Sequence, residues 1–148
     1  MPQSLHQVYG HIVFSTKGRT PIIDANIEIK LYAYMAGIIL DLKAEPVIIN
    51  GMPDHVHVLV KSSKHVTDID FIRQLKGSSS KWITAQGVKN FKWQGGYGWF
   101  GVSAKDLTVA KKYIENQKQH HSSTSFQDEF KSFLTKYNIP YDERYVWD

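Results

Sequence analysis

Residues 55–61 read His-Val-His-Val-Leu-Val-Lys, and this alternation predicts a β-strand with two different faces. The three valines share one face, because successive side chains of a strand point in opposite directions. His55, His57 and Leu59 share the other face. We expect the valines to pack against helices and the strand to lie in the middle of a sheet, with the histidines on the opposite side.

The chain on either side of this strand predicts the element order βαββαβ, followed by two more helices. The predicted strands are Val8–Ser15, Pro46–Asn50, His55–Lys61 and Tyr97–Val102. The predicted helices run from Asp24 to about Leu42, from Thr67 to about Gln86, from Asp106 to about Gln119, and from Thr124 or Ser125 to before Pro140. This order is typical of an α+β fold with a ferredoxin-like or RRM-like antiparallel sheet. We expect a single domain over residues 1–148, with helices on one face of the sheet and the other face free for a ligand.

Composition excludes several classes of protein. The chain has 148 residues and no cysteine, so disulfide scaffolds, cysteine-based zinc sites and thiol catalysis are ruled out. No apolar run approaches the roughly 20 residues of a membrane-spanning helix. The N-terminus lacks the features of a signal peptide, and we therefore expect a cytoplasmic protein without a membrane partner.

The net charge of +4 is unevenly distributed along the chain. Residues 61–120 hold eleven basic and four acidic side chains, a net charge of +7, which leaves −3 for the remainder. Aromatic side chains are interleaved with the lysines of this stretch, and that pattern favours unpaired bases stacked on aromatic rings. An alternative is that the aromatic residues belong to the core, although we expect Trp93, beside Lys92 and two glycines, to be exposed.

The pair His55 and His57 predicts a metal site, because two histidines at positions i and i+2 of a strand share one face. The alternative is that they are two polar residues on a half-exposed strand. A second candidate pair is Tyr113 and Gln117, which lie four residues apart and therefore on one side of the third helix. Neighbouring lysines are expected to make the Tyr113 phenol easier to deprotonate and more nucleophilic. Tyr113 is alternatively a packing residue.

Together these residues predict a metal-assisted attack of Tyr113 on a phosphodiester, with a covalent phosphotyrosine formed as a 3′-hydroxyl leaves. His55 and His57 would hold the ion, and the carbonyl oxygen of Gln117 is a further candidate ligand. Ligand softness alone favours zinc or manganese over magnesium at a histidine pair.

Residues 52–59, Met-Pro-Asp-His-Val-His-Val-Leu, resemble the HUH signature of single-tyrosine transposases of the insertion-sequence-200/605 type, a superfamily that includes the REP-associated tyrosine transposases. Residues 93–103 resemble the family's strand before the catalytic helix. Further matches are Val109, Tyr113, Ile114, Gln117, His120, His121, Phe126, Asp128, Glu129 and Phe130. The resemblance spans nearly the whole chain.

The resemblance implies a DNA transposase that cleaves and rejoins single-stranded DNA at insertion-sequence ends through a 5′-phosphotyrosine. It implies Tyr113 as the nucleophile and His55, His57 and Gln117 as ligands of Mg²⁺ or Mn²⁺. It also implies recognition of subterminal DNA hairpins by a homodimer whose active sites are shared between subunits. An exposed sheet edge at residues 97–102 and an apolar face on the last helix give such a dimer a physical rationale.

Candidate DNA contacts are the basic and aromatic residues Arg73, Lys76, Lys81, Lys92, Trp93, Lys111 and Lys112. Two other functions remain open from the sequence. One is a rolling-circle replication initiator or relaxase, which also uses two histidines and a tyrosine. The other is a non-catalytic module that binds single-stranded nucleic acid on an open sheet face.

Overall fold

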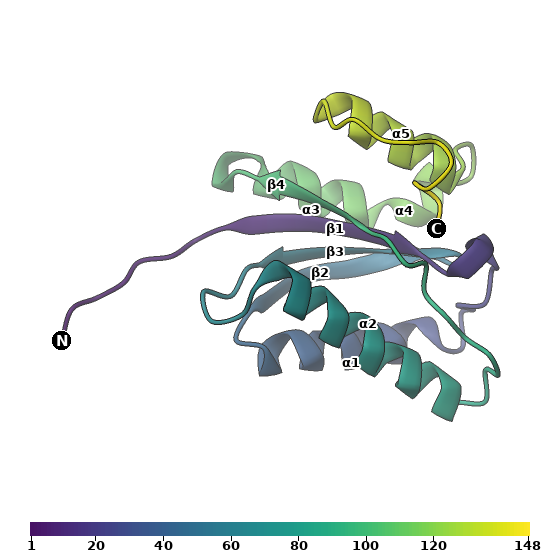
Figure 1. Cartoon of the computed structure of the whole chain (residues 1–148), viewed down its shortest axis with the longest axis horizontal. Coiled ribbons are helices and arrows are strands. Elements are labelled where there is room, and N and C mark those ends of the chain that lie inside the picture. The colour runs from purple at the N-terminus through teal and green to yellow at the C-terminus, as the bar shows by residue number, and fades with distance from the viewer.

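The computed structural model describes residues 1–148 and contains one antiparallel sheet of four strands (Figure 1). The strands are β1 (Tyr9–Ser15), β2 (Glu45–Met52), β3 (His55–Lys61) and β4 (Gly98–Val102), in the spatial order β2-β3-β1-β4. The predicted βαββαβ order and antiparallel sheet are therefore confirmed. The β3 strand is central, between β1 and β2, and β4 lies at an edge.

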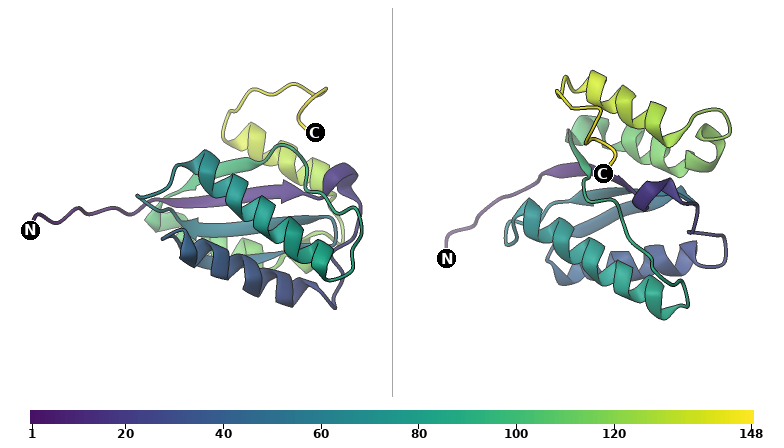
Figure 2. Two further views of the ribbon diagram at one scale, coloured as in Figure 1. Left: turned by 60° about the horizontal axis from the view of Figure 1, so that its bottom comes forward. Right: turned by 45° about the vertical axis from the view of Figure 1, so that its right-hand side comes forward.

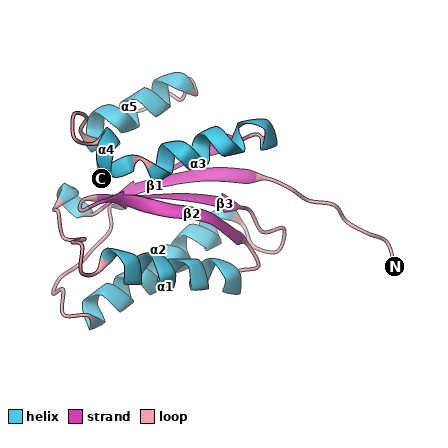
Figure 3. Ribbon diagram, turned by 180° about the vertical axis from the view of Figure 1, so that it is seen from behind, coloured by secondary structure: helices cyan, strands magenta, loops and turns pink.

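Helices cover both faces of the sheet. They are α1 (Glu28–Asp41), α2 (Asp68–Ala85), α3 (Leu107–Glu115), α4 (Gln117–His120) and α5 (Phe126–Lys136), with short 3₁₀ turns at Lys17–Arg19 and Ala104–Asp106. The first two helices pack on one face, and α3, α4 and α5 lie on the other (Figures 2 and 3). The expectation of a free sheet face is wrong, because the chain itself covers that face with its last three helices. No helix combines the length and the apolar character needed to cross a membrane.

Each face of the sheet has its own hydrophobic core. The larger core contains Val56, Val58 and Val60 of β3, all fully buried on the side of α1 and α2, as the alternation predicted. The smaller core joins β1 and β4 to α5 and consists of Val13, Phe100, Phe126, Phe130 and Leu134. The apolar face of α5 is therefore used within the chain to hold this helix over the sheet.

Side chains cap the starts of α2 and α5 and the turn before α1, whereas Asp106 makes no such bond at the start of α3. The hydroxyl oxygen of Thr67 accepts a hydrogen bond from the backbone N–H of Asp70 at the start of α2, and Ser125 does the same at the start of α5. Asp24 accepts from two backbone N–H groups just before α1. Such caps satisfy donors that have no partner within the helix.

We expect Gly98→Ala to destabilise the fold, because a Cβ at this position would lie 2.7 Å from the ring of Phe130 on α5. Overpacking of this kind costs about 1–3 kcal/mol. Gly101→Ala is a matched control on the same strand, since a Cβ there meets nothing within 4 Å. Urea unfolding of both variants measures the difference. Equal midpoints for the two variants would contradict the contact between β4 and α5.

Candidate active site

The two histidines of β3 lie under the second layer of helices. His55 and His57 are both fully buried, so the alternative of polar residues on a half-exposed strand is wrong. His11 on β1 shares this face, and its Nε2 lies 2.7 Å from Nδ1 of His57. Buried imidazoles need partners for both ring nitrogens, and the remaining nitrogens of His55 and His57 point toward α5.

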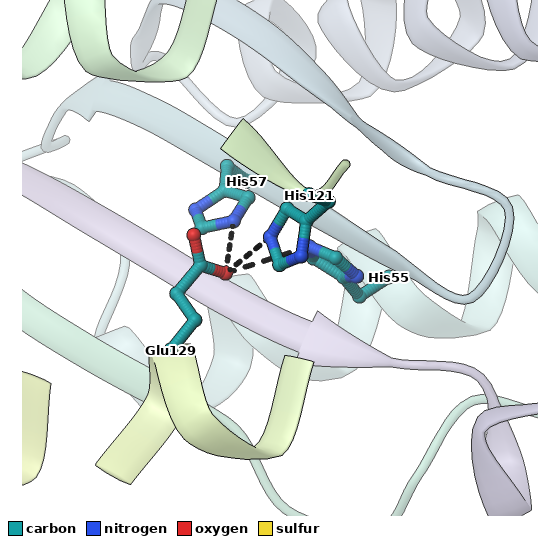
Figure 4. Close-up of side chains that lie close together, drawn as sticks. All are labelled: His55, His57, His121 and Glu129. Atoms are coloured by element: carbon teal, nitrogen blue, oxygen red, sulfur yellow. Dashed lines mark hydrogen bonds and ion pairs between the residues drawn. The ribbon is translucent and has the colours of Figure 1, made fainter. Parts of the chain in front are cut away.

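Their common partner is Glu129, which extends from α5 and is only 2% exposed. Its Oε1 lies 3.0 Å from Nε2 of His57, 3.0 Å from Nε2 of His121 and 3.5 Å from Nε2 of His55 (Figure 4). One ligand atom from each of these four residues falls within 4.8 Å of all the others. A single carboxylate oxygen therefore lies beside the Nε2 atoms of three imidazoles.

Tyr113 and Gln117 reach the other oxygen of the same carboxylate. The Tyr113 hydroxyl donates a short hydrogen bond to Oε2 of Glu129, and Nε2 of Gln117 donates to that oxygen at 3.2 Å. Oε1 of Gln117 lies 3.4 Å from Nε2 of His55. The structure thus brings together, within one chain, the four residues singled out in the sequence: the two histidines, Tyr113 and Gln117.

The helix that carries Tyr113 breaks before Gln117, where the sequence predicted one continuous helix. Asn116 ends α3, and α4 begins at the next residue. The side-chain amide of Asn50 on β2 donates to the backbone carbonyl oxygens of Ile114 at 2.9 Å and Glu115 at 3.2 Å. This side chain binds carbonyl groups at the end of α3 and fixes that end to the sheet, directly after the tyrosine.

The Tyr113 phenol is harder to deprotonate than the neighbouring lysines suggested. Burial and the adjacent Glu129 carboxylate raise the pKa of Tyr113 well above its usual value. Lys111 and Lys112 are exposed on α3, and Lys118 forms an ion pair with a glutamate of α1. The expectation of a phenol activated by lysines is therefore wrong, because the charge nearest to the hydroxyl is negative.

The histidines and Glu129 shift each other's ionisation. Burial alone would raise the pKa of Glu129, but the adjacent imidazoles of His121, His55 and His57 outweigh it and hold that pKa far below its usual range. Burial lowers the pKa of His57 to about 4. For His55, burial is outweighed by Asp54 and Glu129, which raise its pKa. Glu129 is therefore the fixed anion of the site, facing a neutral His57.

Sequence reasoning matched Glu129 and His121 to the family pattern but gave neither a place in the site. The available signal was the position of Glu129 within the apolar stripe of the last helix, between Phe126 and Phe130. A carboxylate on a buried stripe is almost always paired, so it predicts a buried partner. His121 follows an equivalent neighbour, His120, and nothing in the sequence says which of the two points inward.

The nitrogens that face the centre are suited to hold a metal ion. Nδ1 of His55 donates to Asp54 at 2.7 Å, and Nδ1 of His121 is hydrogen-bonded to the carbonyl oxygen of Thr124. These partners place the ring proton on Nδ1 and leave the Nε2 lone pair free, which is the usual outer shell of a metal-ligating histidine. The donor set of imidazole nitrogens, one carboxylate and one amide oxygen therefore fits a divalent cation.

A cavity of about 720 Å³ opens beside the Tyr113 hydroxyl, between α3, α5 and β4. Aromatic side chains on one side include Phe133 and Tyr137, and polar groups on the other include Ser103 and Asp106. Tyr113 and Glu129 both line this cavity, so it gives a substrate access to the tyrosine.

Two candidate DNA contacts are occupied within the protein. Trp93 is only 8% exposed, and its indole N–H donates to the hydroxyl of Ser79 at 3.0 Å, so the expectation of an exposed ring is wrong. Lys76 is half-buried and donates to the backbone carbonyl oxygens of Gln94 at 2.8 Å and Gly96 at 2.6 Å. Both side chains therefore hold the loop before β4 in place.

The other basic candidates fall into separate regions. Lys111 and Lys112 are exposed on α3, on the same side of the sheet as Tyr113, whereas Arg73 and Lys81 are exposed on α2, on the opposite side. Lys92 lies near Lys17 and Arg19 around a second cavity of about 570 Å³. This cluster of three cations was not recognised from the sequence, because Lys92 lies more than 70 positions after Lys17 and Arg19.

Residues 4–117 match the family model described as IS200-like transposase, which covers most of the chain. Among curated proteins, the ISDra2 transposase TnpA of Deinococcus radiodurans is 26% identical over 120 residues, covering 76% of this chain and 86% of that protein.

Two solved structures share the fold. A crystal structure of a chain from Deinococcus radiodurans R1, assigned as a transposase, has a TM-score of 0.62 at 24% identity and covers 79% of this chain and 98% of that one. A REP-associated tyrosine transposase bound to a REP hairpin has a TM-score of 0.62 at 17% identity, and the match covers 84% of this chain and 74% of that one. Because the family model matches most of its length, the chain belongs to the IS200-like transposases, which are single-strand DNA endonucleases and strand transferases.

Proposed function

We propose that the chain cleaves single-stranded DNA with Tyr113 as the nucleophile, assisted by a divalent ion at His55, His57 and Gln117. The Tyr113 oxygen attacks the phosphorus, the bond to the 3′-oxygen breaks, and a 5′-phosphotyrosine forms with release of a 3′-hydroxyl end. Attack of a 3′-hydroxyl on the phosphotyrosine then rejoins the strand and releases the tyrosine. The ion, Mg²⁺ or Mn²⁺, would polarise the phosphate as a Lewis acid.

One observation carries this proposal: the nucleophile and the histidines converge on the same carboxylate. The Tyr113 hydroxyl and the three imidazole Nε2 atoms lie on opposite oxygens of Glu129. A phosphate group bound near the histidines is therefore within reach of the phenolic oxygen. Holding the reacting groups in this geometry supplies much of the acceleration of such reactions.

The cavity beside Tyr113 gives the substrate its place. Unpaired nucleotides are flat and flexible enough to enter it, and aromatic side chains such as Phe133 and Tyr137 offer faces for a base. Lys111 and Lys112 lie on the same side of the molecule and can contact the phosphates that flank the cleaved bond.

We propose in addition that the chain binds DNA hairpins, as the REP-associated relative does. The cluster of Lys17, Arg19 and Lys92 supports this, since three cations around one cavity attract the phosphates of a duplex stem. Arg73 and Lys81 on α2 remain candidate contacts for DNA outside the active site.

We propose that two copies form a homodimer through the edge of β4. An unpaired strand edge presents free N–H and C=O groups to a second copy, and β4 has a neighbour on one side only. The apolar face of α5 no longer supports the dimer, because it is buried on β1 and β4 of its own chain. Sedimentation tests whether the dimer forms. Mixing Tyr113→Phe chains with His57→Ala chains tests whether the subunits share active sites.

The function is tested by incubating the protein with Mg²⁺ or Mn²⁺ and a single-stranded oligonucleotide that carries the end of the element with its hairpin. We expect a covalent protein–DNA adduct, with the DNA attached through its 5′-phosphate to the peptide that contains Tyr113. Mass spectrometry of the digested adduct identifies that residue. Attachment at another residue would overturn the assignment, and binding without any adduct would favour the non-catalytic module.

A rolling-circle initiator or relaxase would form the same kind of adduct on its own origin DNA. Oligonucleotides from insertion-sequence ends and from plasmid origins therefore distinguish the two functions. The family match favours the insertion-sequence end as the substrate.

A further inference from the structure

We propose that His121 and Glu129 are also ligands of the ion, so that three imidazoles and one carboxylate select manganese or a similar transition metal over magnesium. This inference rests on the proposed function, because it takes the ion to be held by His55, His57 and Gln117. It adds two ligands and a metal preference to that site.

The distances among these groups match the edges of a coordination shell. Around an ion with bonds of about 2.1 Å, neighbouring ligand atoms lie about 3.0–3.4 Å apart. Oε1 of Glu129 lies 3.0, 3.0 and 3.5 Å from the Nε2 atoms of His57, His121 and His55. Oε1 of Gln117 lies 3.4 Å from Nε2 of His55. Glu129 is therefore spaced from the three imidazoles, and Gln117 from His55, as neighbouring ligands of one ion would be.

His121 has the same arrangement as the two histidines of β3. Its Nδ1 is bound to the carbonyl oxygen of Thr124, and its Nε2 points to the centre. That Nε2 is buried and makes no hydrogen bond, although Oε1 of Glu129 is 3.0 Å away. A buried polar atom without a hydrogen bond is costly, and a metal ion would supply the missing partner.

The neighbouring His120 is a natural comparison, because it lies one residue away but differs in its surroundings. Its side chain is 35% exposed, and its Nε2 lies 3.5 Å from the other carboxylate oxygen of Glu129, Oε2. It is not among the four residues whose ligand atoms cluster together. The structure therefore assigns a ligand role to the second histidine of the pair and not to the first.

The donor types decide the preferred ion. Mg²⁺ favours oxygen ligands and retains several waters, which three imidazoles would replace with nitrogen. Mn²⁺ and the later divalent ions accept imidazole more readily. Five protein donors leave one position of an octahedral shell for a phosphate oxygen of the DNA.

The test measures Mn²⁺ and Mg²⁺ affinity by calorimetry on the full chain, and counts bound histidine nitrogens by pulsed electron paramagnetic resonance of the Mn²⁺ complex. We expect three nitrogens and tighter binding of Mn²⁺ in the unaltered protein. In His121→Ala we expect two nitrogens, a loss of Mn²⁺ affinity of about 10-fold or more, and a smaller loss for Mg²⁺. Glu129→Gln should weaken both ions and leave three nitrogens.

His120→Ala is the matched control and should retain all three nitrogens and its Mn²⁺ affinity. Circular dichroism of each variant confirms that it is folded, and Glu129→Gln keeps the shape of the side chain. Two nitrogens in the unaltered protein, with no effect of His121→Ala, would overturn this inference and leave the two-histidine site intact. Absence of any metal binding would overturn the inference and the proposed metal site together.

Discussion

Replacement of Tyr113 by phenylalanine is expected to abolish the covalent protein–DNA adduct while the protein still binds DNA and metal. The change removes the only atom of the side chain that can attack phosphorus, and loss of a nucleophile typically lowers activity by about 1000-fold or more. It also removes one hydrogen bond to the buried Glu129 carboxylate, at a cost of about 1 kcal/mol. The adduct is measured on denaturing gels, and DNA binding by fluorescence anisotropy.

Tyr34→Phe is the control for this experiment, since Tyr34 stacks on Trp82 on the opposite side of the sheet. It should form the adduct as the unaltered protein does. Cleavage by the Tyr113→Phe protein at an unchanged rate would show that another group is the nucleophile. Loss of metal binding in that variant would show that the phenol has a structural role at the histidines.

Val58→Asp is expected to unfold the protein, which is the largest stability effect that a single substitution in β3 should produce. Val58 is fully buried in the larger core, under α1 and α2. The side chains of that core are apolar and offer a carboxylate no hydrogen bond, so the substitution costs about 4 kcal/mol or more. Domains of this kind have total stabilities of about 5–15 kcal/mol.

Val58→Asn separates the effect of charge from that of shape, because the two substituted side chains have almost the same volume. Unfolding by urea, followed by circular dichroism, should give a lower midpoint for the aspartate than for the asparagine variant at neutral pH. The aspartate variant should recover part of its stability at low pH, where the carboxyl group is protonated. A cooperative transition at the original midpoint would show that Val58 does not face the core.

The element order predicted that residues 55–61 lie in the middle of the sheet, and their alternation predicted which face packs on helices, because a strand with one apolar face has only one way to bury it. The same residues could not show how deeply the histidines lie. Their burial depends on α3, α4 and α5, whose position over the sheet is set by contacts such as Phe130 against β4. A local pattern reports which face a side chain is on, and distant segments decide what covers it.

The surroundings of Tyr113 likewise depend on residues that are distant in the sequence. Its sequence neighbours are lysines, which predicted a phenol of lowered pKa, but Glu129, sixteen residues later, places a carboxylate against the hydroxyl. Spacing along one helix did identify Tyr113 and Gln117 as partners. The residues missed, His121 and Glu129, come from separate segments, and only the folded chain brings them to the histidines.

The enclosure of the active site has a consequence for the fate of the covalent intermediate. The histidines and Glu129 are buried, and the single cavity beside Tyr113 is lined by Phe133, Tyr137 and other groups that a bound strand would contact. With DNA in that cavity, little bulk water reaches the phosphotyrosine, and closed sites protect reactive intermediates from hydrolysis in this way. If Tyr113 is the nucleophile, as proposed, we expect the phosphotyrosine bond to last until a 3′-hydroxyl end returns, so that strands are exchanged rather than simply cut.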